Sequence, residues 1–176
     1  MPEPCALKGA WAVLRGNTPL LPDHRGKYSI TMSRKDTYHD VVKETLIKEG
    51  WTVTHDPYIF RTDPRLIADL GAERLIAAER KYEKIVVEIK SFLRTSQVVD
   101  LEEAVGKYSI YNIFLRQHEP DRRLWLAVPL HASENILSRE VGRVTLEAMR
   151  IPVIVYSLSG KEPLIWKIPK SFTENV

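Results

Sequence analysis

The chain has 176 residues, 44% of them hydrophobic and 28% charged, so it is long enough to bury the core of one domain. It has no apolar run near the roughly 20 residues of a membrane helix and no signal-peptide pattern, so we expect a cytoplasmic protein without membrane contact. The single cysteine, Cys5, excludes an internal disulfide and a cysteine-rich zinc site. A net charge of +3 does not by itself indicate a nucleic-acid-binding protein.

The sequence pattern changes at about residue 32. Residues 1–31 contain four prolines, three glycines and no sustained period, which predicts an irregular N-terminal extension. Met32, followed by SRKDTYHD, resembles a second protein start, so the interpretation of residues 1–31 as an artefact of an upstream start stays open. We expect residues 32–176 to form the folded domain.

Helical and extended patterns alternate along the rest of the chain. Apolar side chains at helical spacing predict a helix over 36–50, with Asp36 as its cap and Gly50 as its end. The next predicted elements are strands over 51–55, 65–80 and 84–90, a helix over 95–117, a strand over 122–129, a helix over 132–150, and strands over 152–158 and 163–168. Gly71 predicts a bulge or bend, and RKYEK at 80–84 a charged turn. This order predicts an α/β domain with a central mixed β-sheet flanked by α-helices.

The predicted strand KIVVEIK, at 84–90, contains both an acid and a base. Because side chains alternate along a strand, Glu88 and Lys90 share one face. We expect this strand to lie inside the sheet, where an ionised group is costly unless it is paired or bound to a metal. Asp69 precedes Glu88 by 18 intervening residues, a hairpin length that can bring the two carboxylates together. The simpler alternative is an exposed Glu–Lys pair on a half-buried strand.

Two carboxylates and a lysine are the groups of a metal-dependent phosphodiesterase site. Mg²⁺ (or Mn²⁺) takes one or two carboxylates together with waters and phosphate oxygens, so Asp69 and Glu88 are the candidate metal ligands. Lys90 is the candidate for positioning water and stabilising charge on the phosphate. An acid, a spacer of roughly ten to thirty residues and [D/E]-x-K form the PD-(D/E)xK nuclease pattern, which is a weak signal on spacing alone.

A longer set of motifs resembles one family. HDVVKETLIKEGWTVTHDP, DLGAE, VEIKSF and EPDRRLWLAVP follow one another as in the XisH family, the fdxN-element excision controlling factors of cyanobacteria. The resemblance covers about residues 32–168. It implies a restriction-endonuclease-like fold and a role in developmentally controlled excision of a DNA element. The implied partners are a site-specific recombinase and a small XisI-like protein. Whether members cleave DNA does not follow from the resemblance.

The resemblance also implies a set of site residues. Asp40 corresponds to the acid of the first helix, Asp69 and Glu88 to the two strand acids, and Lys90 to the lysine of the motif. A glutamine common on the following helix is replaced by Lys107, which implies either phosphate binding by this lysine or altered activity.

Several other polar and aromatic residues have simpler explanations than catalysis. A lone histidine is more often structural, and tyrosines at helical spacing more often belong to the core. The residues concerned are His39, His55, Tyr108, Tyr111 and Phe114. Arg122 and Arg123 begin a predicted strand, and we expect their charges to face solvent rather than phosphate.

Three hypotheses for the function therefore stay open. The first is a metal-dependent nuclease that acts on DNA through Asp69, Glu88 and Lys90. The second is a catalytically silent nuclease-fold protein that binds DNA or a recombinase as an accessory factor. The third is an interaction module that binds an XisI-like partner, with DNA contact supplied by the assembly, which the small net charge favours. A homo-oligomer is compatible with each of them.

Overall fold

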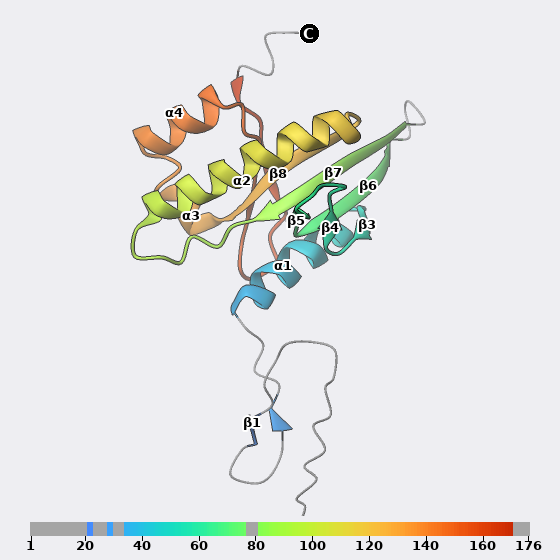
Figure 1. Ribbon diagram of the computed structural model, residues 1–176. Helices are drawn as coiled ribbons and strands as arrows, with labels where there is room; N and C mark the ends of the chain where they lie inside the picture. Colours follow the sequence, from blue (N-terminus) through green and yellow to red (C-terminus); the bar gives the residue numbers. More distant parts are fainter. Residues whose placement is uncertain (1–20, 23–27, 30–33, 77–80, 171–176) are drawn as a thin grey trace, which may run out of the picture. The chain divides into compact units, whose positions relative to one another are not determined.

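The computed structural model describes residues 21–22, 28–29, 34–76 and 81–170 (Figure 1). The chain divides into two compact units, Met1–Ser33 and Arg34–Val176. In the first unit, β1 (Leu21–Pro22) and β2 (Tyr28–Ser29) pair in antiparallel orientation. The rest of the extension predicted at 1–31 lies outside the described residues, so its role stays a prediction.

A six-stranded mixed sheet forms the centre of the second unit, in the order β10-β9-β8-β7-β6-β3. The strands are β3 (Thr52–His55), β6 (Leu70–Ile76), β7 (Lys81–Ile89), β8 (Arg122–Pro129), β9 (Val153–Tyr156) and β10 (Ile165–Lys167). Strands β7, β8 and β9 run parallel, whereas β6, β3 and β10 are joined by antiparallel pairing. The central position of β7 is confirmed, and so is the predicted class of a mixed sheet flanked by helices.

Helices cover both faces of this sheet (Figure 1). Helix α1 (Arg34–Lys48) supplies Val42 and Leu46 to a buried cluster that includes Ile85 and Val87 of β7. Helices α2 (Gln97–His118), α3 (Leu130–Glu134) and α4 (Glu140–Ala148) lie on the other face, where Val86 of β7 belongs to a second cluster. Alternation along β7 therefore directs its even-numbered side chains, Glu88 among them, towards the α2 layer.

The strand predicted over 65–80 is interrupted at Asp69, and the irregularity predicted at Gly71 is found in its pairing with β3, whose register shifts between Val53 and His55. Strand β5 (Ile67–Ala68) pairs with β4 (Tyr58–Ile59) in a separate two-stranded sheet, and β6 begins at Leu70. Gly71 lies within β6, where a Cβ atom would come within 2.9 Å of the Tyr58 ring and 3.2 Å of His55. The chain thus passes from one sheet to the other at Asp69, and glycine is needed for close packing.

Three further details of the predicted elements are wrong. The first helix begins at Arg34, so Asp36 lies inside it and is not its cap, although Gly50 does follow its end with φ +86°. The helix predicted over 132–150 is divided into α3 and α4, and in the connection the Ser138 hydroxyl lies within hydrogen-bonding distance of the carbonyl oxygens of Glu134 and Asn135. The predicted turn 80–84 is extended from Lys81 onwards, and residue 80 lies outside the described residues.

The prediction that Arg122 faces solvent is also wrong. Its side chain is 5% exposed, and its guanidinium group contacts Glu73 Oε1 at 2.7 Å and Glu119 Oε2 at 2.6 Å. Two carboxylates supply the partners that a buried cation needs. The tyrosines Tyr108 and Tyr111 are buried, as predicted. Within the described ranges, no helix is long and apolar enough to cross a membrane.

Gly142 and Gly106 give a matched test of the packing of α4 and α2. A Cβ atom at Gly142 would overlap the Ile136 carbonyl oxygen and lie 2.6 Å from Leu137 Cα, whereas one at Gly106 meets nothing within 4 Å. Gly142→Ala should destabilise the protein by about 1–3 kcal/mol through overpacking. Gly106→Ala should stabilise it by about 0.5–1 kcal/mol, because alanine is the better helix former. Chemical denaturation measures both, and a stabilising Gly142→Ala would contradict the close approach of α4 to the preceding turn.

Candidate functional site

A pocket of about 440 Å³ opens beside the end of β7, and residues from both helical layers line it. Asp69 lies between β5 and β6, Lys90 directly follows β7, and Lys107 comes from α2. The lining residues are Tyr38, His39, Asp69, Ile89, Lys90, Ser91, Leu93 and Lys107. Three of the polar residues singled out in the sequence, which are far apart along the chain, therefore border one space.

A hydrogen bond to the end of β7 holds Asp69 near Glu88. The antiparallel ladder of β6 and β7 ends at the pair Leu70–Val87, and Asp69 and Glu88 are the next residues along the two segments. Asp69 Oδ2 accepts a hydrogen bond of 2.7 Å from the backbone N–H of Ile89, which fixes this carboxylate against β7. Asp69 is thus held against the residue that follows Glu88, at the end of the central strands.

Glu88 is bound by Lys107. The residue is 2% exposed, and its Oε1 atom lies 2.7 Å from the ammonium nitrogen of Lys107. Burial acts to lower the pKa of Lys107, but the hydrogen bond and the negative charge of Glu88 outweigh it and raise this pKa above its ordinary value. Glu88 is not among the residues that line the pocket, whereas Lys107 is. The lysine therefore connects the buried acid to the pocket.

Lys90 is held by two acids at the start of α2. Its ammonium nitrogen lies 2.8 Å from Asp100 Oδ1 and 2.6 Å from Glu103 Oε2. Arg94 joins the same group, because its guanidinium contacts Glu103 at 2.7 Å and its backbone N–H donates to Asp100 Oδ2 at 3.0 Å. Lys90 projects from β7 towards α2, like Glu88, and its charge is already matched by carboxylates.

Asp100 is the most enclosed acid of this group, with 1% of its surface exposed. Burial acts to raise its pKa, but the hydrogen bonds from Lys90 and the Arg94 backbone and the charges of both residues lower it below its ordinary value. The pKa of Glu103 is lowered chiefly by its hydrogen bond from Lys90. Both acids therefore carry a negative charge at neutral pH and fix the Lys90 ammonium.

Three residues of α2, spaced four apart, each contact a different part of the site. Glu103 binds Lys90, Lys107 binds Glu88, and the Tyr111 hydroxyl donates a hydrogen bond of 2.8 Å to the carbonyl oxygen of Ile67. Burial raises the pKa of Tyr111, and the charge of Glu88 adds to this effect. Residues four apart lie on one helix face, so α2 holds β5 and the end of β7 in one arrangement.

The turn that leaves β7 has an unusual backbone conformation. Phe92 has φ 52°, in the left-handed region that residues other than glycine adopt rarely. Its side chain is 2% exposed and belongs to the same buried cluster as Val86 and Tyr108. Burial of the ring offsets the cost of this conformation, which directs the chain from Lys90 and Ser91 towards α2.

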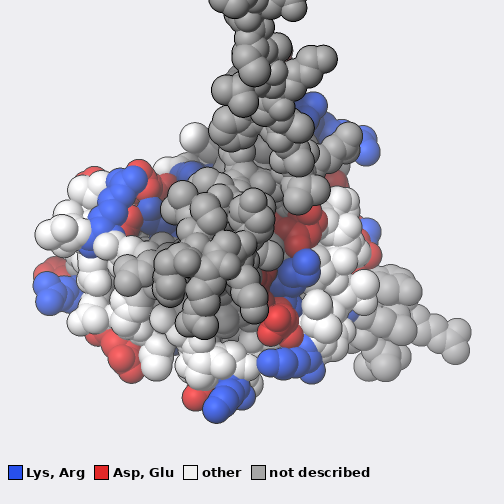
Figure 2. Space-filling view, turned by 90° about the horizontal axis from the view of Figure 1, so that it is seen from below, with Lys and Arg blue, Asp and Glu red and all other residues white. Residues whose placement is uncertain are grey.

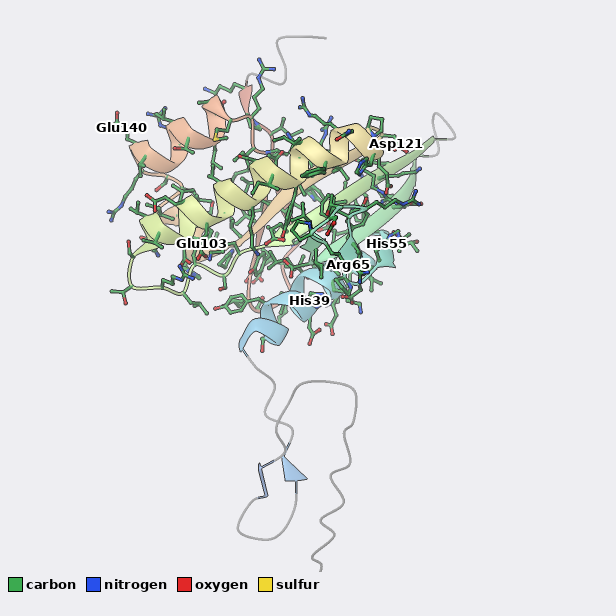
Figure 3. The ribbon with its side chains drawn as sticks, in the orientation of Figure 1. His39, His55, Arg65, Glu103, Asp121 and Glu140 are labelled. Carbon is green, nitrogen blue, oxygen red and sulfur yellow. The ribbon has the colours of Figure 1, made fainter. Side chains whose placement is uncertain are left out.

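The structure does not bring Asp40 into the pocket. Its side chain is 43% exposed, and its Oδ1 atom lies 3.6 Å from His39 Nδ1. His39 does line the pocket, and its Nε2 atom lies 2.9 Å from Asp56 Oδ1. His55 lies elsewhere, with its ring edge-on to Tyr58. Figure 3 labels His39 on α1 and Glu103 on α2, and it marks Asp121 beyond the opposite end of α2.

The carboxylate oxygens near this pocket provide part of the ligand set that a hard divalent cation such as Mg²⁺ requires. Asp69 and Glu88 provide the one or two carboxylates that Mg²⁺ takes, with water and phosphate oxygens completing its shell. Among the described residues, no group of three or more histidine, cysteine, aspartate and glutamate side chains is placed to hold a metal. The contact between Glu88 Oε1 and the Lys107 ammonium group shows that this carboxylate already binds one cation.

Charges of both signs are mixed on the described part of one face of the molecule (Figure 2). On the described part of the face shown in Figure 2, lysine and arginine side chains lie close to aspartate and glutamate side chains. This distribution agrees with the small net charge of +3. Long-range attraction of a polyanion is therefore weak, and local contacts at a site have to supply most of the affinity.

The fold and site thus define a mixed α/β protein with two acids, Asp69 and Glu88, and two lysines, Lys90 and Lys107, near one end of its central strands. The family model described as XisH protein matches residues 32–163. The chain belongs to the XisH family.

Two solved structures are similar to the chain. One is an XisH family protein from Nostoc punctiforme, and the other is an fdxN element excision controlling factor protein from Anabaena variabilis. Each is 32% identical in sequence with a TM-score of 0.65, and each comparison covers 74% of this chain and 98% of the other. No curated protein matches the chain.

Asp100 gives a test of the charge network that holds Lys90. Asp100→Asn should destabilise the protein at pH 7 by about 2 kcal/mol, because it removes the buried one of the two carboxylates that hold Lys90. The folded-state pKa of Asp100 lies below its ordinary value. Its contribution is therefore present above about pH 4 and is lost as the pH falls through the folded-state pKa.

Denaturant unfolding of both proteins at pH 7 and at pH 3 measures this difference, which should shrink at the lower pH. Asp121→Asn is the matched control, because it removes an exposed ion pair with Lys84 and should cost less than about 1 kcal/mol. A difference between wild type and Asp100→Asn that is equal at the two pH values would contradict the role given to the Asp100 charge.

Proposed function

We propose that the chain is an excision controlling factor that acts on DNA, and that its pocket is a PD-(D/E)xK-type site for phosphodiester hydrolysis. The observation that carries this proposal is the hydrogen bond to Asp69 from the backbone N–H of Ile89, the residue after Glu88, with Asp69 and Lys90 bordering the same pocket. The family relationship supports the part concerning excision, because one similar protein is described as an fdxN element excision controlling factor. A restriction-endonuclease-like fold is the architecture that this proposal implies.

The residues of the site have distinct roles under this proposal. Asp69 and Glu88 would hold Mg²⁺ or Mn²⁺, which supplies a water of lowered pKa and polarises the phosphodiester. The Ile89 N–H holds Asp69 in orientation, and Asp100 and Glu103 hold Lys90 at the pocket wall. Lys90 stabilises negative charge on the phosphate from there. His39 borders the pocket from α1, where it can contact a bound nucleic-acid strand.

A second candidate function is favoured by the ion pairs of the two lysines. Lys107 neutralises Glu88, and Lys90 is bound to two other acids, so both lysines have carboxylate partners without a metal ion. Such a site suits a catalytically silent accessory factor that contributes to excision through an XisI-like partner and a recombinase. The two functions differ in whether Asp69 and Glu88 are needed for DNA cleavage or only for the fold.

Cleavage of plasmid and branched DNA separates these functions. Purified protein, alone and with an XisI-like partner, is incubated with supercoiled and branched DNA in Mg²⁺ or Mn²⁺. The nuclease proposal predicts metal-dependent cleavage that falls by about a hundredfold or more in Asp69→Asn and Glu88→Gln, because each change removes a metal ligand. Both substitutions keep the shape of the side chain, so the fold should persist.

Asp121→Asn is again the control, since it removes one carboxylate at an exposed ion pair with Lys84. It should retain cleavage within about twofold of wild type, because exposed pairs contribute little. Equal cleavage by wild type and both site variants would reveal a contaminating nuclease and contradict the proposal. No cleavage by any protein, alone or with the partner, would favour the silent accessory factor.

A further inference from the structure

We propose that Lys107 competes with a divalent metal ion for Glu88 and thereby sets the metal affinity of the site. This inference rests on the proposed metal site and concerns its regulation by a residue of the chain itself. In this arrangement the lysine and the metal ion exclude each other at one carboxylate. The site is held in a low-affinity form by an internal cation.

The position of Lys107 carries the first step of this inference. Its ammonium nitrogen lies 2.7 Å from Glu88 Oε1, on a carboxylate whose side chain is 3% exposed. A carboxylate so enclosed needs a cationic partner, because burying an uncompensated charge is costly. A metal ion bound at this oxygen would meet the ammonium group at a distance where like charges repel strongly. One of the two cations therefore has to leave Oε1.

Lys107 is the cation that can leave. Its side chain is 55% exposed, and it lines the pocket, so the ammonium group can move into solvent without disturbing the buried core. Glu88 is fixed within β7, which is paired on both sides by β6 and β8. Movement of Lys107 would connect Glu88 to the pocket that Asp69 already borders. The competition thus depends on a mobile partner and a fixed acid.

Lys90 does not have the same effect. Its side chain is 18% exposed, and its ammonium group is held by Asp100 and Glu103 at 2.8 and 2.6 Å. These two acids, with Arg94, form a charge network separate from the Lys107–Glu88 ion pair. The two lysines that border the pocket are therefore distinguished by their partners, and only the partner of Lys107 is a proposed metal ligand.

Direct measurement of Mn²⁺ binding tests the competition. Free Mn²⁺ is followed by electron paramagnetic resonance during titration of the full-length wild type, Lys107→Gln and Lys84→Gln. Lys107→Gln should bind Mn²⁺ at least about tenfold more tightly than wild type, since the competing ion pair is gone. Lys84→Gln is the matched control: it removes a lysine from the same strand as Glu88 and an ion pair of similar length, 2.8 Å to Asp121. It should change the affinity less than about twofold.

Two further variants test whether a gain in Mn²⁺ affinity comes from loss of the Lys107 charge and requires the Glu88 carboxylate. Lys107→Arg keeps the charge and should remain within about threefold of wild type. The double variant Lys107→Gln with Glu88→Gln should lose the gain in affinity, because the gain requires the released carboxylate. Thermal melting shows whether each variant is folded before titration.

The binding measurements distinguish failure of the Lys107 competition from failure of the proposed metal site. Equal or weaker binding in Lys107→Gln than in wild type overturns the competition, while Glu88-dependent binding in wild type would leave the metal site intact. A gain that persists in the double variant overturns the competition as well, since the ion then binds elsewhere. Absence of Mn²⁺ binding in wild type and in Lys107→Gln alike overturns both the competition and the metal site.

Discussion

The buried carboxylate of Glu88 is the constraint on which the arrangement around the site depends. Glu88 lies in the central strand β7 and is 2% exposed, so its charge requires a cation close by. Helix α2 supplies that cation as Lys107, while the same helix face holds Lys90 through Glu103 and β5 through Tyr111. The position of α2 on the sheet is thus tied to charge pairing at the end of β7, in addition to its apolar contacts.

Charge balance also explains how one arrangement is compatible with two functions. A lysine and a divalent ion can each neutralise Glu88, but they leave different groups free to act. With Lys107 in place, Glu88 belongs to a structural ion pair, as the accessory-factor proposal requires. With Lys107 displaced, Asp69 and Glu88 would offer the one or two carboxylates that Mg²⁺ takes. Under the proposed competition, the two functions differ in which cation Glu88 binds.

Much of this arrangement could be predicted from local patterns in the sequence. Alternation in KIVVEIK indicates that Glu88 faces away from Ile85 and Val87, and the structure assigns these residues to opposite layers. The acids Asp100 and Glu103 were not predicted as partners of Lys90, because the pairing depends on where α2 crosses the sheet. Polar residues that recur at helical spacing, such as Glu103 and Lys107, are the sequence pattern that indicates a polar helix face at this position. The break at Asp69 depends on β5 pairing with β4, a two-residue contact too short to leave a periodic pattern.

Anomalous diffraction from crystals soaked in Mn²⁺ locates the ion and Lys107 in one experiment. If the two cations compete for Glu88, an anomalous peak is expected at coordination distance, about 2.1 Å, from carboxylate oxygens of both Asp69 and Glu88. The Lys107 ammonium group should then have moved away from Glu88 Oε1, from which it lies 2.7 Å in the present structure. A peak at another position, or no peak with Lys107 still bound to Glu88 at saturating Mn²⁺, would contradict the competition.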